Sequence, residues 1–203
     1  MHQAGGPGWR ITMDTSSPML LALYLKDTAG LVGAGLPPLA PASPRVHESD
    51  HHQITQHVGG VGALRREWEA WWASLLDHHP QVIPAAEPPD FGAFNDAPAL
   101  QRSLQAHFGS ALTWALERRA DYERLEADRE TRGDARILQE MVAGRQLEVG
   151  PAAKDFTLTI IELPLAEDRA WLVDSNKVIA SQSLMDDQEA FRSYLAPVIE
   201  MLV

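Results

Sequence analysis

The segment His47-Glu48-Ser49-Asp50-His51 has a spacing that could hold a catalytic metal ion. In the pattern His-Glu-x-x-His, a helix presents both imidazoles on one face, where they bind zinc. The glutamate beside the first imidazole then deprotonates the metal-bound water. The motif therefore offers His47 and His51 as zinc ligands, and Glu48 as the general base of a zinc-dependent hydrolase.

The third ligand of such a site has several candidates. His57 follows at the spacing of the longer pattern His-Glu-x-x-His-x-x-Gly-x-x-His, so residues 47–57 resemble the zinc segment of metzincin proteases. The resemblance implies that His57 completes the metal shell. Ile54 stands where that pattern has glycine, and isoleucine resists the positive φ that would turn His57 towards the metal. Glu67 or Glu69 is the alternative, giving two histidines and a carboxylate.

A polar, histidine-rich surface loop is the competing interpretation of this segment, and it is the one we favour. The segment follows a proline-rich stretch, and its apolar residues are few: Val46, Ile54 and Val58. A catalytic zinc helix, in contrast, is normally packed into a core. We therefore expect no cofactor, with zinc as the alternative.

Composition excludes several other classes of protein. The chain has 203 residues and no cysteine, which rules out disulfides, thiol nucleophiles and thiolate metal sites. A net charge of −11 opposes binding to nucleic acid or to an anionic membrane surface. The apolar run at residues 18–25 is too short to span a bilayer and has no basic leader. We expect a cytoplasmic protein without nucleic-acid or membrane partners.

Periodicity predicts the elements that would position these residues. We expect strands at residues 9–13, 18–25, 156–163, 170–173 and 178–181. The run at 18–25 could equally begin a short buried helix. We expect helices at residues 63–78, 98–129 and 134–143, and from Asp186 or Asp187 onward. The fold class is α+β, an antiparallel sheet built from N-terminal and C-terminal strands, the last three as a meander, with three to four helices between and after them.

The domain organisation follows from length and from the distribution of proline and glycine. Residues 1–8 are expected to form a flexible tail. Residues 9–203 are expected to form a single α+β domain, with proline-rich connections at 36–44 and 80–98. The second half of the helix at 98–129 carries opposite charges four residues apart, which is typical of a solvated helix face.

Two further positions could bind or react. Trp68 and Trp72 are expected in the core. Trp71 lies at the margin of the tryptophan stripe and is the candidate contact for a partner. Together with Arg65 and Arg66, it is alternatively a candidate contact for a ligand.

Glu162 is in phase with the apolar side of its strand. A dry carboxylate there would have a raised pKa and could act as an acid or base. Pro164 instead favours a strand end at which Glu162 reaches solvent.

These observations favour a non-catalytic binding or assembly domain that acts through protein–protein contacts, as a homo-oligomer or with another protein. The first alternative is the zinc-dependent hydrolase that uses His47, Glu48 and His51. The second is a small-molecule binding module at Trp71.

Overall fold

A computed structural model describes residues 2–6, 8–77, 87–133 and 135–203 of the chain. The chain folds into two compact units. The sheet unit comprises residues 1–16 and 119–203, and the helical unit comprises residues 17–118. The single domain expected over residues 9–203 stays a prediction, because the compactness of each unit does not decide whether the two unfold together.

The sheet unit contains one five-stranded sheet with the strand order β1-β2-β3-β5-β4. The strands are β1 (His2–Gly6), β2 (Trp9–Asp14), β3 (Phe156–Leu163), β4 (Ala170–Asp174) and β5 (Lys177–Ser181). N-terminal and C-terminal strands share this sheet, and the fold is α+β. The sheet is mixed, however, and not antiparallel: β2 pairs parallel with β3, and β3 pairs parallel with β5.

Burial explains why β5 and not β4 lies beside β3. Residues 178–181 of β5 are all buried, which suits an interior strand. In β4, Leu172 and Asp174 are exposed, which suits an edge. The predicted meander of the last three strands is therefore wrong, because β4 lies outside β5 and pairs antiparallel with it. The long stretch of chain between β2 and β3 supplies the crossover that a parallel pair requires.

The N-terminal residues differ from expectation in two ways. Residues 2–6, expected in a flexible tail, form β1, which pairs antiparallel with β2 from His2 opposite Met13 to Gly6 opposite Trp9. Residues 18–25 lie in helix α1 (Ser17–Thr28) and not in a strand. Most of this helix is buried. A helix surrounded by protein needs no polar face, which explains why residues 18–25 form an uninterrupted apolar run.

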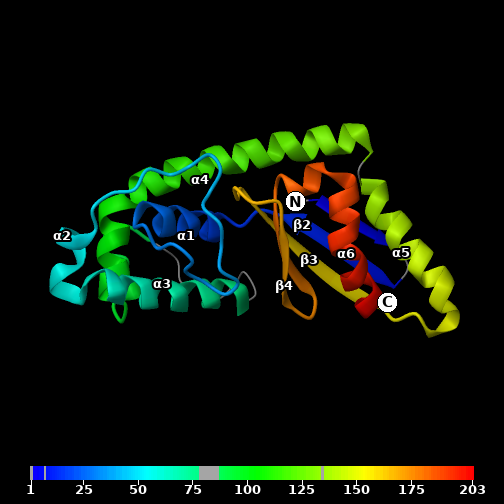
Figure 1. The fold of residues 1–203 in the computed structure, drawn as a ribbon, viewed down its shortest axis with the longest axis horizontal. Coiled ribbons are helices and arrows are strands. Elements are labelled where there is room, and N and C mark those ends of the chain that lie inside the picture. Colours follow the sequence, from blue (N-terminus) through cyan, green and yellow to red (C-terminus); the bar gives the residue numbers. More distant parts are fainter. Residues whose placement is uncertain (1, 7, 78–86, 134) are drawn as a thin grey trace. The chain divides into compact units, whose positions relative to one another are not determined.

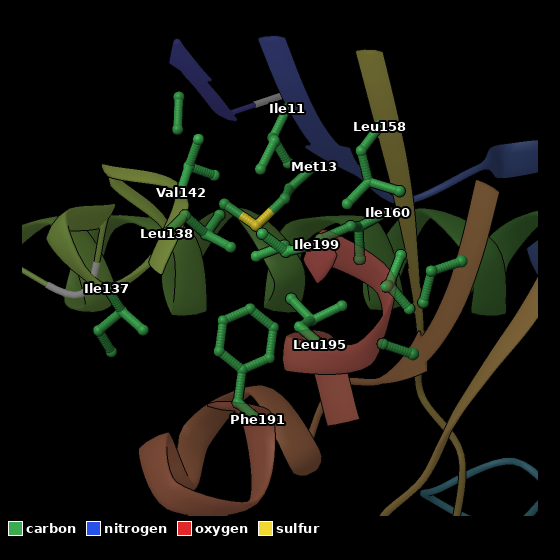
Figure 2. Close-up of a cluster of buried hydrophobic side chains, with 14 of the residues drawn as sticks. Ile11, Met13, Ile137, Leu138, Val142, Leu158, Ile160, Phe191, Leu195 and Ile199 are labelled. Carbon is green, nitrogen blue, oxygen red and sulfur yellow. The ribbon is translucent and has the colours of Figure 1, made fainter. Parts of the chain in front are cut away.

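Three helices contribute to the sheet unit: α4 (Pro98–Arg132) from Arg119 onward, α5 (Ala135–Val149) and α6 (Gln188–Leu202). Figure 1 shows α5 and α6 beside the sheet. Figure 2 shows side chains of β2, β3, α5 and α6 meeting in one apolar core. Asp187 caps α6 as predicted, since its carboxylate accepts hydrogen bonds from the N–H groups of Glu189 and Ala190.

The helical unit contains α1, the short α2 (His52–Thr55), α3 (Gly60–Asp77) and the first part of α4. The described residues thus form six α-helices, more than the three to four expected, because α1 and α2 are added. Trp68 and Trp72 of α3 are buried as predicted, with stacked rings 5.5 Å apart. None of the helices among the described residues is long and apolar enough to cross a membrane.

Part of the proline-rich connection at residues 36–44 is anchored to α1. The buried Lys26 ammonium donates a hydrogen bond to the carbonyl oxygen of Ala40 at 3.1 Å and pairs with Asp27 at 2.7 Å. The other carboxylate oxygen of Asp27 accepts a hydrogen bond from the N–H of Ala42 at 2.6 Å. Two charged side chains of one helix therefore satisfy backbone groups of this proline-rich segment.

Candidate functional site

The residues of the His-Glu-x-x-His motif do not share a helix. Residues 45–50 are irregular, and α2 begins only at His52. His47, Glu48 and His57 are exposed, whereas His51 is buried. Within the described parts of the chain, no group of three or more histidine, aspartate or glutamate side chains could hold a metal ion.

The alternative third ligands have other partners. Glu67 accepts a hydrogen bond from the N–H of Leu100 at 2.8 Å, near the start of α4, and Glu69 pairs with Arg65 at 3.4 Å. Zinc binding stays a prediction, and the helix that the motif needs is not formed by residues 47–51.

His51 is instead paired with another histidine. Its Nδ1 lies 3.0 Å from the carbonyl oxygen of Ser49, so Nδ1 donates to this oxygen. Among the described residues, the buried Nε2 of the same ring has no hydrogen-bond partner. The His51 ring stacks on that of His107 of α4, with centroids 4.7 Å apart. Burial and the neighbouring His51 lower the pKa of His107.

We expect the helical unit to lose stability as the pH falls below about 6.5, the ordinary pKa of histidine. The folded chain favours neutral His107, so its contribution is present above that pH and is lost as the pH falls through the lowered pKa. His107→Gln should reduce this loss. Urea unfolding at pH 7.5 and pH 5.5 measures it, and an equal loss in both proteins would contradict the assignment.

Trp71 is less accessible than expected. It is 5% exposed, and its ring packs edge-on against Phe94 with centroids 5.4 Å apart. Together with Arg66 it lines a depression of about 290 Å³ on the helical unit. Arg65 donates a hydrogen bond to the carbonyl oxygen of Val32 at 2.7 Å. A partner contact at Trp71 stays a prediction, but it would have to use this depression and not a projecting ring.

Glu162 is buried, contrary to the expectation that it reaches solvent at the end of β3. It is 1% exposed. Pro164 does not lead the chain into solvent, because Pro164 and Leu165 are themselves buried. The chain also returns to this point: the N–H of Gln182 donates to the carbonyl oxygen of Leu163 at 2.9 Å. The segment that follows β5 therefore covers the end of β3.

Arg129 of α4 binds this buried carboxylate within a cluster of charges. Its Nη1 donates to Glu162 Oε2 at 2.6 Å, its Nε donates to Asp186 Oδ1 at 3.1 Å, and its Nη2 donates to the carbonyl oxygen of Gln182 at 2.9 Å. Arg132 reaches the same Asp186 oxygen at 3.4 Å. The cluster ties α4 to β3 and to the segment between β5 and α6.

The environment of the cluster shifts the pKa values of its members. Burial raises the pKa of Glu162, and the Arg129 guanidinium offsets only part of this. Burial alone would lower the pKa of Arg129, but Glu162 and Asp186 raise it, so the guanidinium keeps its charge. Burial, followed by the charge of Glu162, raises the pKa of Tyr122, so that its hydroxyl stays protonated. A buried carboxylate with a shifted pKa in a concave site is typical of functional sites.

A cavity of about 40 Å³ within the sheet unit adjoins this cluster. Its polar lining consists of Tyr122, Glu126, Arg129, Glu130 and Glu162. Its apolar lining consists of Met13, Ile137, Leu138, Met185 and Phe191. Figure 2 shows four of these apolar residues, Met13 from β2, Ile137 and Leu138 from α5, and Phe191 from α6. We call this site the Glu162 cavity.

Sequence reasoning identified Glu162 as a candidate but missed its partners. Arg129 lies on the second half of α4, whose charge pattern is typical of a solvated helix face, yet it is 9% exposed. The only signal in the sequence for a buried Glu162 is that its position is in phase with the apolar residues of its strand.

Comparison with family models, with curated proteins and with solved structures finds no match to this chain.

Proposed function

We propose that this chain is a non-catalytic binding protein and that the Glu162 cavity is its small-molecule site. Small-ligand sites are mostly apolar hollows with a few fixed polar groups. The observation that carries the proposal is the ion pair of Glu162 and Arg129 at the wall of an apolar cavity. Such a buried pair is weak evidence for stability, because apolar residues often replace it without loss. A role in binding accounts for the pair, because Arg129 would hold the Glu162 carboxylate in a fixed position for a ligand.

The cluster suits binding better than catalysis. Nε, Nη1 and Nη2 of Arg129 are each engaged by protein acceptors, which orients Glu162 but leaves the guanidinium little freedom to follow a reaction. Among the described lining residues of the cavity there is no serine, threonine, histidine or lysine. The hydroxyl, imidazole and amine nucleophiles of serine, threonine, histidine and lysine are therefore not supplied by these lining residues.

We expect at least one of three small probes, n-propylammonium, 1-propanol or propionate, to bind in the cavity. At millimolar concentrations, the probe should shift the amide resonances of Met13, Ile137 and Phe191 in the full chain, while those of Trp71 stay unchanged. Ile137→Phe, which enlarges a lining side chain, should reduce the shifts.

Leu147→Phe is the matched control for this test, because Leu147 lies on the same helix and is 85% exposed. In the Leu147→Phe variant, the probe should shift the amide resonances of the lining residues as much as in the unmodified chain. The proposal is contradicted if none of the three probes shifts the lining residues.

Assembly through a protein–protein contact is the second candidate, and the outer face of α6 favours it. Tyr194, Pro197 and Met201 are all exposed. They follow one another at positions i, i+3 and i+7, which places them on one face of the helix. Leu147 of α5 is exposed as well. Exposed apolar side chains gathered on one helix face, like the three of α6, are typical of interaction surfaces.

The assembly candidate predicts a sedimentation mass above the 22.4 kDa of one chain, or a partner that co-purifies. Met201→Asp should lower the mass to that of a monomer, because a charge on the α6 face would be buried in the contact. Leu172→Asp, at an exposed position on β4, is the control and should leave the mass unchanged. A partnerless monomer at high protein concentration would count against assembly.

A further inference from the structure

We propose that the Glu162 cavity binds a primary ammonium group that carries a short apolar tail. This inference rests on the small-molecule site proposed above and names the chemical class of its ligand. Three properties of the cavity point to this class: its charge balance, the hydrogen bonding of Glu162, and the size and lining of the space.

Negative charge dominates the cavity. The lining contains three carboxylates, those of Glu126, Glu130 and Glu162, against the single guanidinium of Arg129. The adjoining Asp186 and Arg132 add one charge of each sign, so the excess of two negative charges remains. An anionic ligand would meet this excess, and within it the Glu162 carboxylate is buried and therefore the least screened.

Arg129 does not offset the repulsion between this negative charge and an anionic ligand. Its three nitrogens already donate to Glu162, to Asp186 and to the carbonyl oxygen of Gln182. A carboxylate or phosphate group would find only the two remaining N–H groups of the guanidinium, beside the carboxylates of Glu162 and Asp186 that already bind it. Displacing Glu162 to gain a better geometry would leave a buried charge unpaired. The cluster is therefore built to hold a carboxylate of the protein in place, and not to receive one from a ligand.

Glu162 can accept a further hydrogen bond. Among the described residues its one hydrogen bond comes from Arg129 and ends on Oε2. Among the described residues no hydrogen bond ends on Oε1 of the same carboxylate. Because Glu162 is a lining residue of the cavity, this oxygen is left for a donor from a guest. An ammonium group supplies both the hydrogen bond and the opposite charge, and such charge-assisted bonds are about twice as strong as neutral ones.

Size and lining limit the rest of the ligand. At about 10–15 Å³ for each water-sized sphere, a cavity of about 40 Å³ holds about three of them. Five lining residues are apolar, from β2, α5, α6 and the segment before α6. This space suits a few methylene or methyl groups behind the ammonium head, and it excludes sugars and nucleotides from the enclosed part of the cavity.

The test is an NMR titration of the full chain at pH 7 with n-propylammonium, 1-propanol and propionate, which share one tail. We expect n-propylammonium to bind about tenfold more tightly than propionate, and more tightly than 1-propanol. Glu162→Gln keeps the shape and an acceptor but removes the charge. It should weaken n-propylammonium binding by about tenfold, which corresponds to the loss of one charge-assisted hydrogen bond, and change 1-propanol binding by less than about twofold.

Glu123→Gln removes the same charge from an exposed position on α4 that does not line the cavity, and it should leave all three affinities unchanged. The ammonium class is overturned, and the small-molecule site stands, if 1-propanol or propionate binds as tightly as n-propylammonium or if Glu162→Gln has no effect. If none of the probes shifts the lining residues, both proposals fail. If E162Q does not fold, Glu130→Gln, at an exposed lining position, must weaken n-propylammonium binding by about threefold, and an unchanged affinity overturns the inference.

Discussion

Arg129→Met is expected to lower the free energy of unfolding of the sheet unit by about 3–5 kcal/mol, because it leaves a buried carboxylate without its partner. Glu162 is 1% exposed, and its hydrogen bond from Arg129 is 2.6 Å long. Methionine replaces the apolar stem of the arginine side chain but none of its hydrogen bonds. Urea unfolding followed by circular dichroism measures the loss, and hydrogen exchange of β3 amides assigns it to the sheet unit.

Two further variants separate this explanation from simple loss of packing. Glu162→Leu in the Arg129→Met background should recover most of the lost stability, since an apolar pair in place of a buried ion pair is often neutral. Arg192→Met removes an ion pair of similar length, 2.7 Å to Glu140, between exposed side chains. Its cost should stay below about 1 kcal/mol. A double variant as unstable as Arg129→Met alone would contradict the assignment.

Trp68→Ala is expected to destabilise the helical unit by about 3–5 kcal/mol, the usual cost of deleting a buried aromatic side chain. Trp68 is 0% exposed and stacks on Trp72, and its Nε1 donates to the carbonyl oxygen of Ala22 at 2.8 Å. The change therefore opens a cavity between α1 and α3 and removes a buried hydrogen bond. Hydrogen exchange of α1 and α3 amides, together with urea unfolding, measures the loss.

Leu116→Ala is the control for this prediction within the same unit. Leu116 is 60% exposed, so its truncation should change stability by no more than about 0.5 kcal/mol. Trp68→Phe keeps an aromatic ring but loses the hydrogen bond to Ala22, and its cost should lie between those of the other two variants. If Trp68→Ala and Leu116→Ala cost the same, α1 and α3 do not depend on this packing.

The chain's local elements were largely predictable. Strand β3 spans residues 156–163 as expected, and Asp187 caps α6 as expected. The tryptophan stripe of α3 buries Trp68 and Trp72. Alternation, helical spacing and capping are properties of residues within a few positions of each other, so they can be read without knowing the rest of the fold.

The histidine motif shows where local reading stops. Its spacing places the two histidines on one face only if the segment is helical, and whether five residues form a helix depends on what packs against them. In the structure His51 turns inward to stack on His107, which lies 56 positions further along the chain, and His47 and Glu48 stay in an irregular segment. The two histidines that meet are therefore not the two that the motif pairs.

By itself the sequence determined the α+β class, most element boundaries and the apolar phase of Glu162, because each of these is set by neighbouring residues. Only the tertiary structure decided the mixed strand order, the burial of Glu162 and its pairing with Arg129. Strand order depends on competition among strands for interior and edge positions. The pairing joins groups 33 positions apart, and it forms because a buried carboxylate must find an opposite charge wherever the fold provides one.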